Sequence, residues 1–391
     1  MEKPKTGKPL LMPGVSQKMM SSTFWTTRFR DLGLAEDWIG NYKLTLEMSF
    51  QTYLTNVNSS LKKLHSEDSD PLELEKIVTG INCWERPEYG LIVELGDLKL
   101  LPTTRPLFSK EGETDLDRNQ LSSLDPGDQV ILFGMSADGK WLAAVSGAGV
   151  GWIKRKQVGV GTRKEIEDYL NEPDRLITID PRVKILSNDG FTEVSMGCSF
   201  PLNDHLRHTV VVPKRNSEGK LSFKTSAIVG GTVRDHLPKS AHHLLRQAFK
   251  YLGYRYAWGD RDREGAGLDC SRLVRDVLRS LGFNPPRNSR DQLAVGKRKL
   301  RMEGLNITER FSLLHKISPG SLLFTPGHVM FFLGEYQGEV YAIHALNNYR
   351  RIVDNKEESV PVKQVVVSGL SLGAGTDNGS LLEQITEVIE V

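Results

Sequence analysis

The feature that most constrains this chain is the order of its local patterns, which changes twice along 391 residues. Short β-rich runs such as YGLIVEL, DQVILFGM and WLAAVSG fill the stretch from 88 to 233, with turn sequences such as ADGK between them. From residue 238 onward, helical patterns come first and strand patterns follow, which is typical of an α+β domain. A chain of this length exceeds one ordinary core, so we expect several domains.

The β-rich stretch divides into two small all-β units. Thr162 and Glu165 fit a capping box, which predicts one short helix near the start of the second unit. The first residues mix aromatics with helix formers, and Asp70 followed by Pro71 is a typical helix start. We therefore expect a mainly helical or irregular stabilising segment, two all-β domains and one α+β domain, over 1–87, 88–158, 159–236 and 237–391.

Composition excludes several classes of function. With 51 basic and 49 acidic residues, the chain gives no reason to expect nucleic acid as a partner. No run of about 18 apolar residues is present, so no membrane span is expected. The three cysteines, Cys83, Cys198 and Cys270, form neither a disulfide framework nor a zinc-ligand spacing, so we expect no metal site.

The first twenty residues lack the apolar stretch of a secretory signal. A chain from which a signal had been removed would look the same. Two compartments therefore stay open: the cytoplasm, or a cell envelope after removal of a signal.

Cys270 stands where the glycine-rich run EGAGLDC gives way to a helical pattern. Apolar residues recur at helical spacing after it and Gly282 ends the pattern, so Cys270 is expected at a helix start. The free N–H groups and partial positive charge of a helix N-terminus favour a thiolate, and they can stabilise an oxyanion. The alternative is a buried structural cysteine, which is the commoner role of a single cysteine.

Two downstream histidines supply a base for such a nucleophile. His328 opens the strand pattern HVMFFLG, and His344 lies in the next one, VYAIHAL. Adjacent strands could present both rings side by side, with His328 taking the thiol proton and His344 orienting it. A single histidine in a strand is more often an ordinary polar residue, so the proposed site depends on Cys270, His328 and His344 occurring together.

Four motifs in a fixed order resemble those of the NlpC/P60 cysteine peptidases, over about 237–350: YAWGDRDREGAGLDCSRLV, PPRNSRDQ, SPGSLLFTPGHVMFFLG and VYAIHA. The resemblance implies a papain-like α+β fold preceded by two bacterial SH3-like barrels, the first of which narrows the cleft. It also implies hydrolysis of peptidoglycan stem peptides between γ-D-glutamate and diaminopimelate or lysine, without a cofactor. The expected partner is such a peptide with a free N-terminal L-alanine, and the expected state is a monomer.

The resemblance assigns roles to individual residues. Cys270 matches the nucleophile, His328 the base and His344 the third polar residue. Tyr256 matches a tyrosine that lines the active site. The predicted substrate-binding set consists of Tyr256, Asp269, Ser271 and Ser289.

Within that set, Asp269 and Ser289 match positions that contact the free amino end of L-Ala-γ-D-Glu. Each has a structural alternative. Asp269 could cap the helix of Cys270, and Ser289 with Gln292 fits a capping box.

One departure from the family pattern stands beside the nucleophile. Arg272 occupies a position where the family usually has glycine, and its side chain is expected either to point to solvent or to alter the cleft. Two rival functions remain: an inactive protein that binds the cell wall, and a papain-like amidase or acyltransferase on another substrate. The basic clusters KRK (154–156) and KRKLR (297–301) are interpreted as solvated surface, with attraction of anionic wall material as the alternative.

Overall fold

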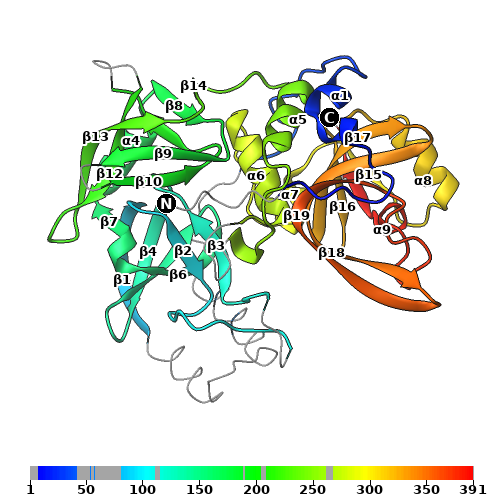
Figure 1. Ribbon diagram of the computed structural model, residues 1–391. Coiled ribbons are helices and arrows are strands. Elements are labelled where there is room, and N and C mark those ends of the chain that lie inside the picture. Colours follow the sequence, from blue (N-terminus) through cyan, green and yellow to red (C-terminus); the bar gives the residue numbers. More distant parts are fainter. Residues whose placement is uncertain are drawn as a thin grey trace. The chain divides into compact units, whose positions relative to one another are not determined.

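The structure is a computed structural model that describes residues 8–41, 53, 57, 81–110, 115–187, 190–203, 208–260 and 267–390. The chain forms two compact units (Figure 1). Unit 1 comprises 1–41, 236–257 and 266–391, and unit 2 comprises 42–235 and 258–265. The expected multidomain chain with mostly β structure and a few helices is confirmed, whereas the individual domain ranges stay predictions. Asp70 lies outside the described residues.

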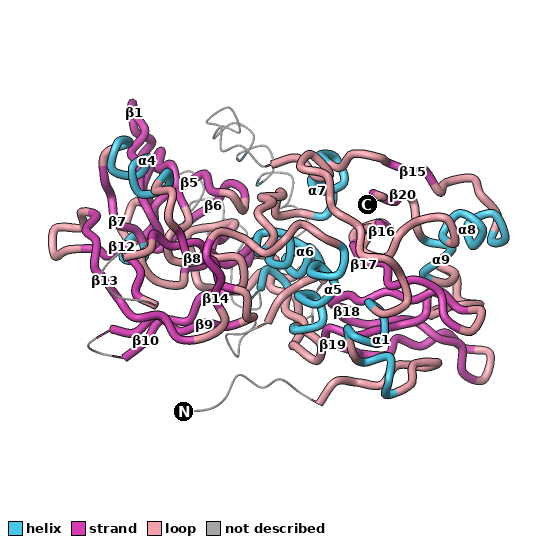
Figure 2. Tube along the Cα trace, turned by 90° about the horizontal axis from the view of Figure 1, so that it is seen from above, coloured by secondary structure: helices cyan, strands magenta, loops and turns pink. Residues whose placement is uncertain are grey.

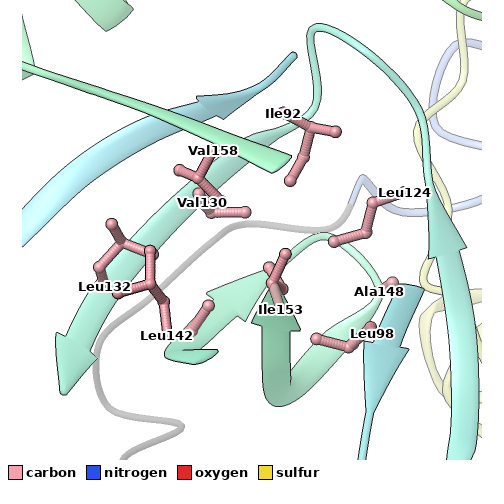
Figure 3. Packing of buried hydrophobic residues seen from close by; sticks show 10 residues of the cluster. Ile92, Leu98, Leu124, Val130, Leu132, Leu142, Ala148, Ile153 and Val158 are labelled. Atoms are coloured by element: carbon pink, nitrogen blue, oxygen red, sulfur yellow. The ribbon is translucent and has the colours of Figure 1, made fainter. Parts of the chain in front are cut away.

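From residue 81 onward, the first sheet of unit 2 has seven antiparallel strands in the order β3-β2-β6-β5-β4-β1-β7. Its strands are β1 (Ile81–Ile92), β2 (Gly96–Lys99), β3 (Gln120–Leu124), β4 (Gln129–Ser136), β5 (Trp141–Ser146), β6 (Gly149–Lys154) and β7 (Val158–Gly161). A short 3-10 helix, η2 (Arg155–Gln157), joins the last two. Apolar side chains from alternate strand positions form the core, and Figure 3 shows Ile92, Val130 and Ile153 among them. β1 starts seven residues earlier than the predicted all-β domain, so the expectation of helical or irregular structure is wrong for 81–87.

The described residues between 162 and 235 form one helix and seven short strands. The helix α4 (Arg163–Asn171) starts at the predicted capping box, because Thr162 accepts from the N–H of Glu165 and the Glu165 carboxylate accepts from that of Thr162. The strands form sheets in the orders β10-β9-β13-β12 and β11-β8-β14. They are β8 (Arg175–Thr178), β9 (Arg182–Ser187), β10 (Gly190–Ser195), β11 (Ser199–Pro201), β12 (Thr209–Arg215), β13 (Leu221–Val229) and β14 (Thr232–Arg234).

Residues 258–265 belong to unit 2, although the chain on both sides of them belongs to unit 1. The hydroxyl of Ser122 donates to the buried carboxylate of Asp260 at 2.9 Å, and the N–H of Ser123 does so at 3.1 Å. Gly259 has φ +62°, and a Cβ there would lie 2.6 Å from the carbonyl oxygen of Gln120. Glycine is therefore required where the short 3-10 helix η3 (Trp258–Asp260) meets β3.

Unit 1 is built on a six-stranded antiparallel sheet in the order β15-β20-β16-β17-β18-β19. The strands are β15 (Lys299–Arg301), β16 (Leu322–Thr325), β17 (His328–Tyr336), β18 (Glu339–Val353), β19 (Lys356–Gly369) and β20 (Glu387–Ile389). A hairpin joins β17 to β18, with Gln337 and Gly338 at positive φ. β18 spans 15 residues, and β15, β19 and β20 were not predicted from the sequence.

The helices of unit 1 lie beside this sheet, where Figures 1 and 2 both show α5 and α6 next to β17. They are η1 (Gln17–Met20), α1 (Ser22–Thr26), α5 (Ala241–Lys250), α6 (Cys270–Ser280), α7 (Ser289–Val295), α8 (Ile307–Leu314) and α9 (Leu381–Gln384). The predicted apolar face of α6 is buried, and Gly282 follows its end at φ +84°. None of the described helices is long and apolar enough to cross a bilayer.

Candidate active site

Cys270 is the first residue of α6, as predicted, and it is 7% exposed. The helix starts there because the carboxylate of Asp269 accepts the N–H of Arg272 at 2.9 Å and so caps it. The backbone N–H of Val329, the residue after His328, acts to lower the pKa of Cys270. The helix that starts at Cys270 packs against β17, the strand that starts at His328.

The two predicted histidines are in direct contact. Nε2 of His328 and Nδ1 of His344 are hydrogen-bonded at 2.7 Å, between the adjacent strands β17 and β18. Nε2 of His344 is hydrogen-bonded in turn to the hydroxyl of Ser368 on β19 at 2.9 Å, and both of these residues are fully buried. The first bond leaves Nδ1 of His328 as the ring nitrogen that can exchange a proton with a thiol.

Burial sets the charge state of these groups. It raises the pKa of Cys270 to about 12, assisted by the Asp269 carboxylate and opposed by the N–H groups of Val329 and Ser271. It lowers the pKa of His328 to about 4 and the pKa of His344 well below its usual value. The expected thiolate at the helix start is therefore wrong for the substrate-free protein, because desolvation outweighs the backbone N–H groups.

An ion pair that the sequence did not indicate lies directly beside the cysteine. Arg287 donates to both oxygens of Asp269, from Nη1 at 3.0 Å and from Nη2 at 2.7 Å, and its Nη1 also reaches the Ser271 hydroxyl at 2.7 Å. Burial alone would raise the pKa of Asp269, but the charge and hydrogen bonds of Arg287 lower it. Arg287 lies in the motif PPRNSRDQ, between the candidate nucleophile and the candidate base in the sequence. Its position directly after two prolines in this motif could have identified it as a site residue.

The remaining predicted substrate residues have different surroundings. Ser271 donates its hydroxyl to Asp269 at 3.1 Å and is buried. Tyr256 is half-buried, and its N–H donates to the carbonyl of Lys363 at 2.9 Å. Ser289, also half-buried, is the first residue of α7.

The predicted capping box of Ser289 with Gln292 is wrong, because the N-cap of α7 is Asn288. The amide of Gln292 instead donates to the carbonyls of Ser271 and Pro286, at 2.9 and 3.0 Å. This buried side chain therefore ties α7 to the start of α6. Among the described residues, Ser289 has no hydrogen-bond partner for its hydroxyl.

Arg272 does not point to solvent, because it is only 1% exposed. Its Nε donates to the carboxylate of Asp276 at 2.5 Å, and the hydroxyl of Tyr251 donates to the same carboxylate at 2.9 Å. The solvent-facing alternative is therefore wrong. The helix that carries Cys270 instead holds a second buried ion pair one turn further along.

Part of this chain is similar to known proteins. Residues 253–369 match the family model described as "NlpC/P60 family". An NlpC/P60 endopeptidase from Photobacterium damselae subsp. piscicida is similar in structure, with a TM-score of 0.73 at 16% identity, over 91% of this chain and 86% of that one. An NlpC/P60 family protein from Bacillus cereus has a TM-score of 0.52 at 18% identity, over 77% and 98% of the two chains. A search of the curated proteins found no match. Residues 253–369 are therefore an NlpC/P60 domain.

Proposed function

We propose that this chain is a cysteine endopeptidase that cleaves peptidoglycan stem peptides between γ-D-glutamate and diaminopimelate or lysine. The observation that carries the proposal is the hydrogen-bonded chain from His328 through His344 to Ser368, on a sheet whose strand β17 packs against the helix that starts at Cys270, within residues that match the NlpC/P60 family model. Cys270 serves as nucleophile, His328 as base and His344 as the residue that orients it.

The hydrogen-bond chain supports Nδ1 of His328 as the nitrogen that takes the thiol proton. For Nδ1 of His328 to accept the thiol proton, Nε2 must carry a hydrogen and donate it to Nδ1 of His344. His344 then holds its own hydrogen on Nε2 and donates it to Ser368. Ser368 thereby acts as a positioning residue, since its oxygen selects the histidine tautomer that leaves His328 basic.

Charge separates only when the substrate is bound. The thiol proton passes to His328 as the sulfur attacks the γ-glutamyl carbonyl, and the backbone N–H groups at the start of α6 stabilise the oxyanion. The C–N bond then breaks, and the leaving amine takes the proton from His328. A water molecule, deprotonated by His328, hydrolyses the acyl-enzyme and regenerates the thiol.

Burial and hydrogen bonding support different roles for the four predicted substrate residues. Asp269 and Ser271 are held by Arg287, so we assign them chiefly to fixing the start of α6 and thus the position of the sulfur. Tyr256 and Ser289 are half-buried, and we assign them to the amino end of the peptide. The upstream ranges 88–158 and 159–236 are proposed as SH3-like domains, and 1–87 as a stabilising segment.

The test is digestion of L-Ala-γ-D-Glu-diaminopimelate, with and without an acetyl group on alanine, followed by mass spectrometry. Wild-type protein should release L-Ala-γ-D-Glu from the free peptide and act weakly on the acetylated one. Cys270→Ala should release none, whereas Cys83→Ala, which removes an exposed thiol, should behave as wild type. Full turnover by Cys270→Ala would overturn the proposal.

A further inference from the structure

Unit 2 contains a cavity that the proposed reaction does not use. Its volume is about 600 Å³, within the range of small-molecule sites. It is lined by the loop at 102–104, the turn between β4 and β5, the end of β6 with η2, and the last residue of β12. Figure 2 shows β5 and β6 side by side.

The lining of this cavity is strongly basic. Five of its side chains are cationic: Lys140, Lys154, Arg155, Lys156 and Arg215. The one acidic side chain, Asp138, accepts from the Ser136 hydroxyl at 2.6 Å and from the Lys140 N–H at 3.0 Å, so it is engaged in the turn. Its carboxylate also lies 3.6 Å from Nζ of Lys140, which leaves the other cations without a counter-charge from the lining.

Three of these cations lack a carboxylate partner within the part of the chain that the structure describes: Lys154, Arg155 and Arg215. Lys156 has only a distant one, Glu94 at 3.6 Å, in an exposed pair. Nε of Arg215 is buried and makes no hydrogen bond to any described residue. A buried N–H without an acceptor is unfavourable, so an oxygen-bearing ligand at this guanidinium would be stabilised.

The aromatic wall of the cavity restricts where a ligand can lie. Nζ of Lys154 lies 5.7 Å from the ring centroid of Trp141, so the ammonium group is held over the indole face. Nη2 of Arg215 packs close to Gly219, where a Cβ would come within 2.7 Å of it. Two of the cations are thus positioned by packing rather than by salt bridges.

We propose that this cavity binds a compact anion with at least two phosphate or carboxylate groups. The guanidinium of Arg215 can hold one group through two parallel N–H bonds, and Lys154 with Arg155 can hold the second. The sequence cluster KRK thereby acquires a specific role. The cluster KRKLR differs, because Lys299 donates to the carbonyl of Ala294 and Arg301 lies in the edge strand β15.

The test is calorimetric titration of the full chain at about 150 mM salt with two probes, inorganic pyrophosphate and the tricarboxylate tricarballylate. At least one probe should bind with one-to-one stoichiometry. Binding of pyrophosphate alone would assign the cavity to phosphate groups, and binding of tricarballylate alone to carboxylate groups. Arg215→Gln should weaken binding about tenfold, the effect of losing hydrogen bonds to a charged group.

Matched variants separate a built site from general attraction. Arg301→Gln removes the same charge from the exposed edge strand of unit 1 and should change affinity less than about twofold, because Arg301 does not line the cavity and exposed charges are screened at this salt. Arg215→Lys keeps the positive charge but loses the planar guanidinium that can donate two parallel hydrogen bonds. Its affinity should therefore lie between those of Arg215→Gln and wild type. The proposal is overturned if neither probe binds saturably, or if Arg301→Gln and Arg215→Gln lose affinity equally. The thermal unfolding of each variant is recorded, so that affinities are compared only between folded proteins.

Discussion

The two sides of the candidate active site handle charge in opposite ways. On the helix side, Asp269 and Arg287 form a buried, bidentate ion pair that fixes the start of α6. On the sheet side, burial keeps His328 and His344 neutral and linked by hydrogen bonds. The comparison indicates that permanent charges position the sulfur, while the groups that move protons stay uncharged until a substrate arrives.

The largest expected effect comes from the sheet side. His328→Ala removes the proposed base and should lower kcat/KM on the stem tripeptide by about 10³-fold, within the usual range for general-base removal. The matched control is His315→Ala, a half-exposed histidine of the same unit, which should act as wild type. Activity of His328→Ala within tenfold of wild type would assign the proton transfer to another group.

A second expected effect tests the helix side. Arg287→Ala leaves the Asp269 carboxylate buried without its partner, which should lower the free energy of unfolding of unit 1 by about 3–5 kcal/mol. Arg163→Ala breaks the exposed pair with Glu167 and should cost far less, because water and salt screen an exposed ion pair. Urea denaturation of both variants measures the difference. Equal losses would show that the ion pair of Asp269 with Arg287 does not anchor α6.

The smallest expected effect lies at the far end of the hydrogen-bond chain. Ser368→Ala removes the acceptor for His344, so kcat should fall roughly tenfold while KM stays unchanged, in line with one lost buried hydrogen bond. Ser368→Thr keeps the hydroxyl and should restore most of the rate. Ser359→Ala, at an exposed position of the same strand, is the control. A Thr variant as slow as the Ala variant would point to packing rather than to tautomer selection.

Local patterns carried most of what could be predicted. The helix start at Cys270 follows from its apolar periodicity, and the contact of His328 with His344 follows from two adjacent strand patterns. What was missed depends on distant partners. Arg287 and Arg272 are charged residues that a sequence places at the surface by default, and only tertiary pairing with Asp269 and Asp276 explains their burial.

Ser368 shows the same limit on the sheet side. Its strand, β19, begins with the charged run KEES and carries a proline, so its first half lacks the alternation that marks a half-buried strand. The fourth member of the hydrogen-bond chain was therefore not predicted. The prediction of the α7 N-cap failed for a more local reason. Asn288 and Ser289 are both good N-cap residues, and the choice between them depends on backbone geometry.

The most direct measurement of the central claim, that the cysteine and its base are uncharged before substrate binds, is the alkylation rate of Cys270 by iodoacetamide against pH. The background from the other two thiols is removed with Cys83→Ala and Cys198→Ala. Because only the thiolate reacts and burial raises the pKa of Cys270 to about 12, the rate should rise about tenfold per pH unit from pH 6 to 10, without a plateau. A plateau reached below pH 7 would reveal a thiolate–imidazolium pair in the free protein and contradict the account.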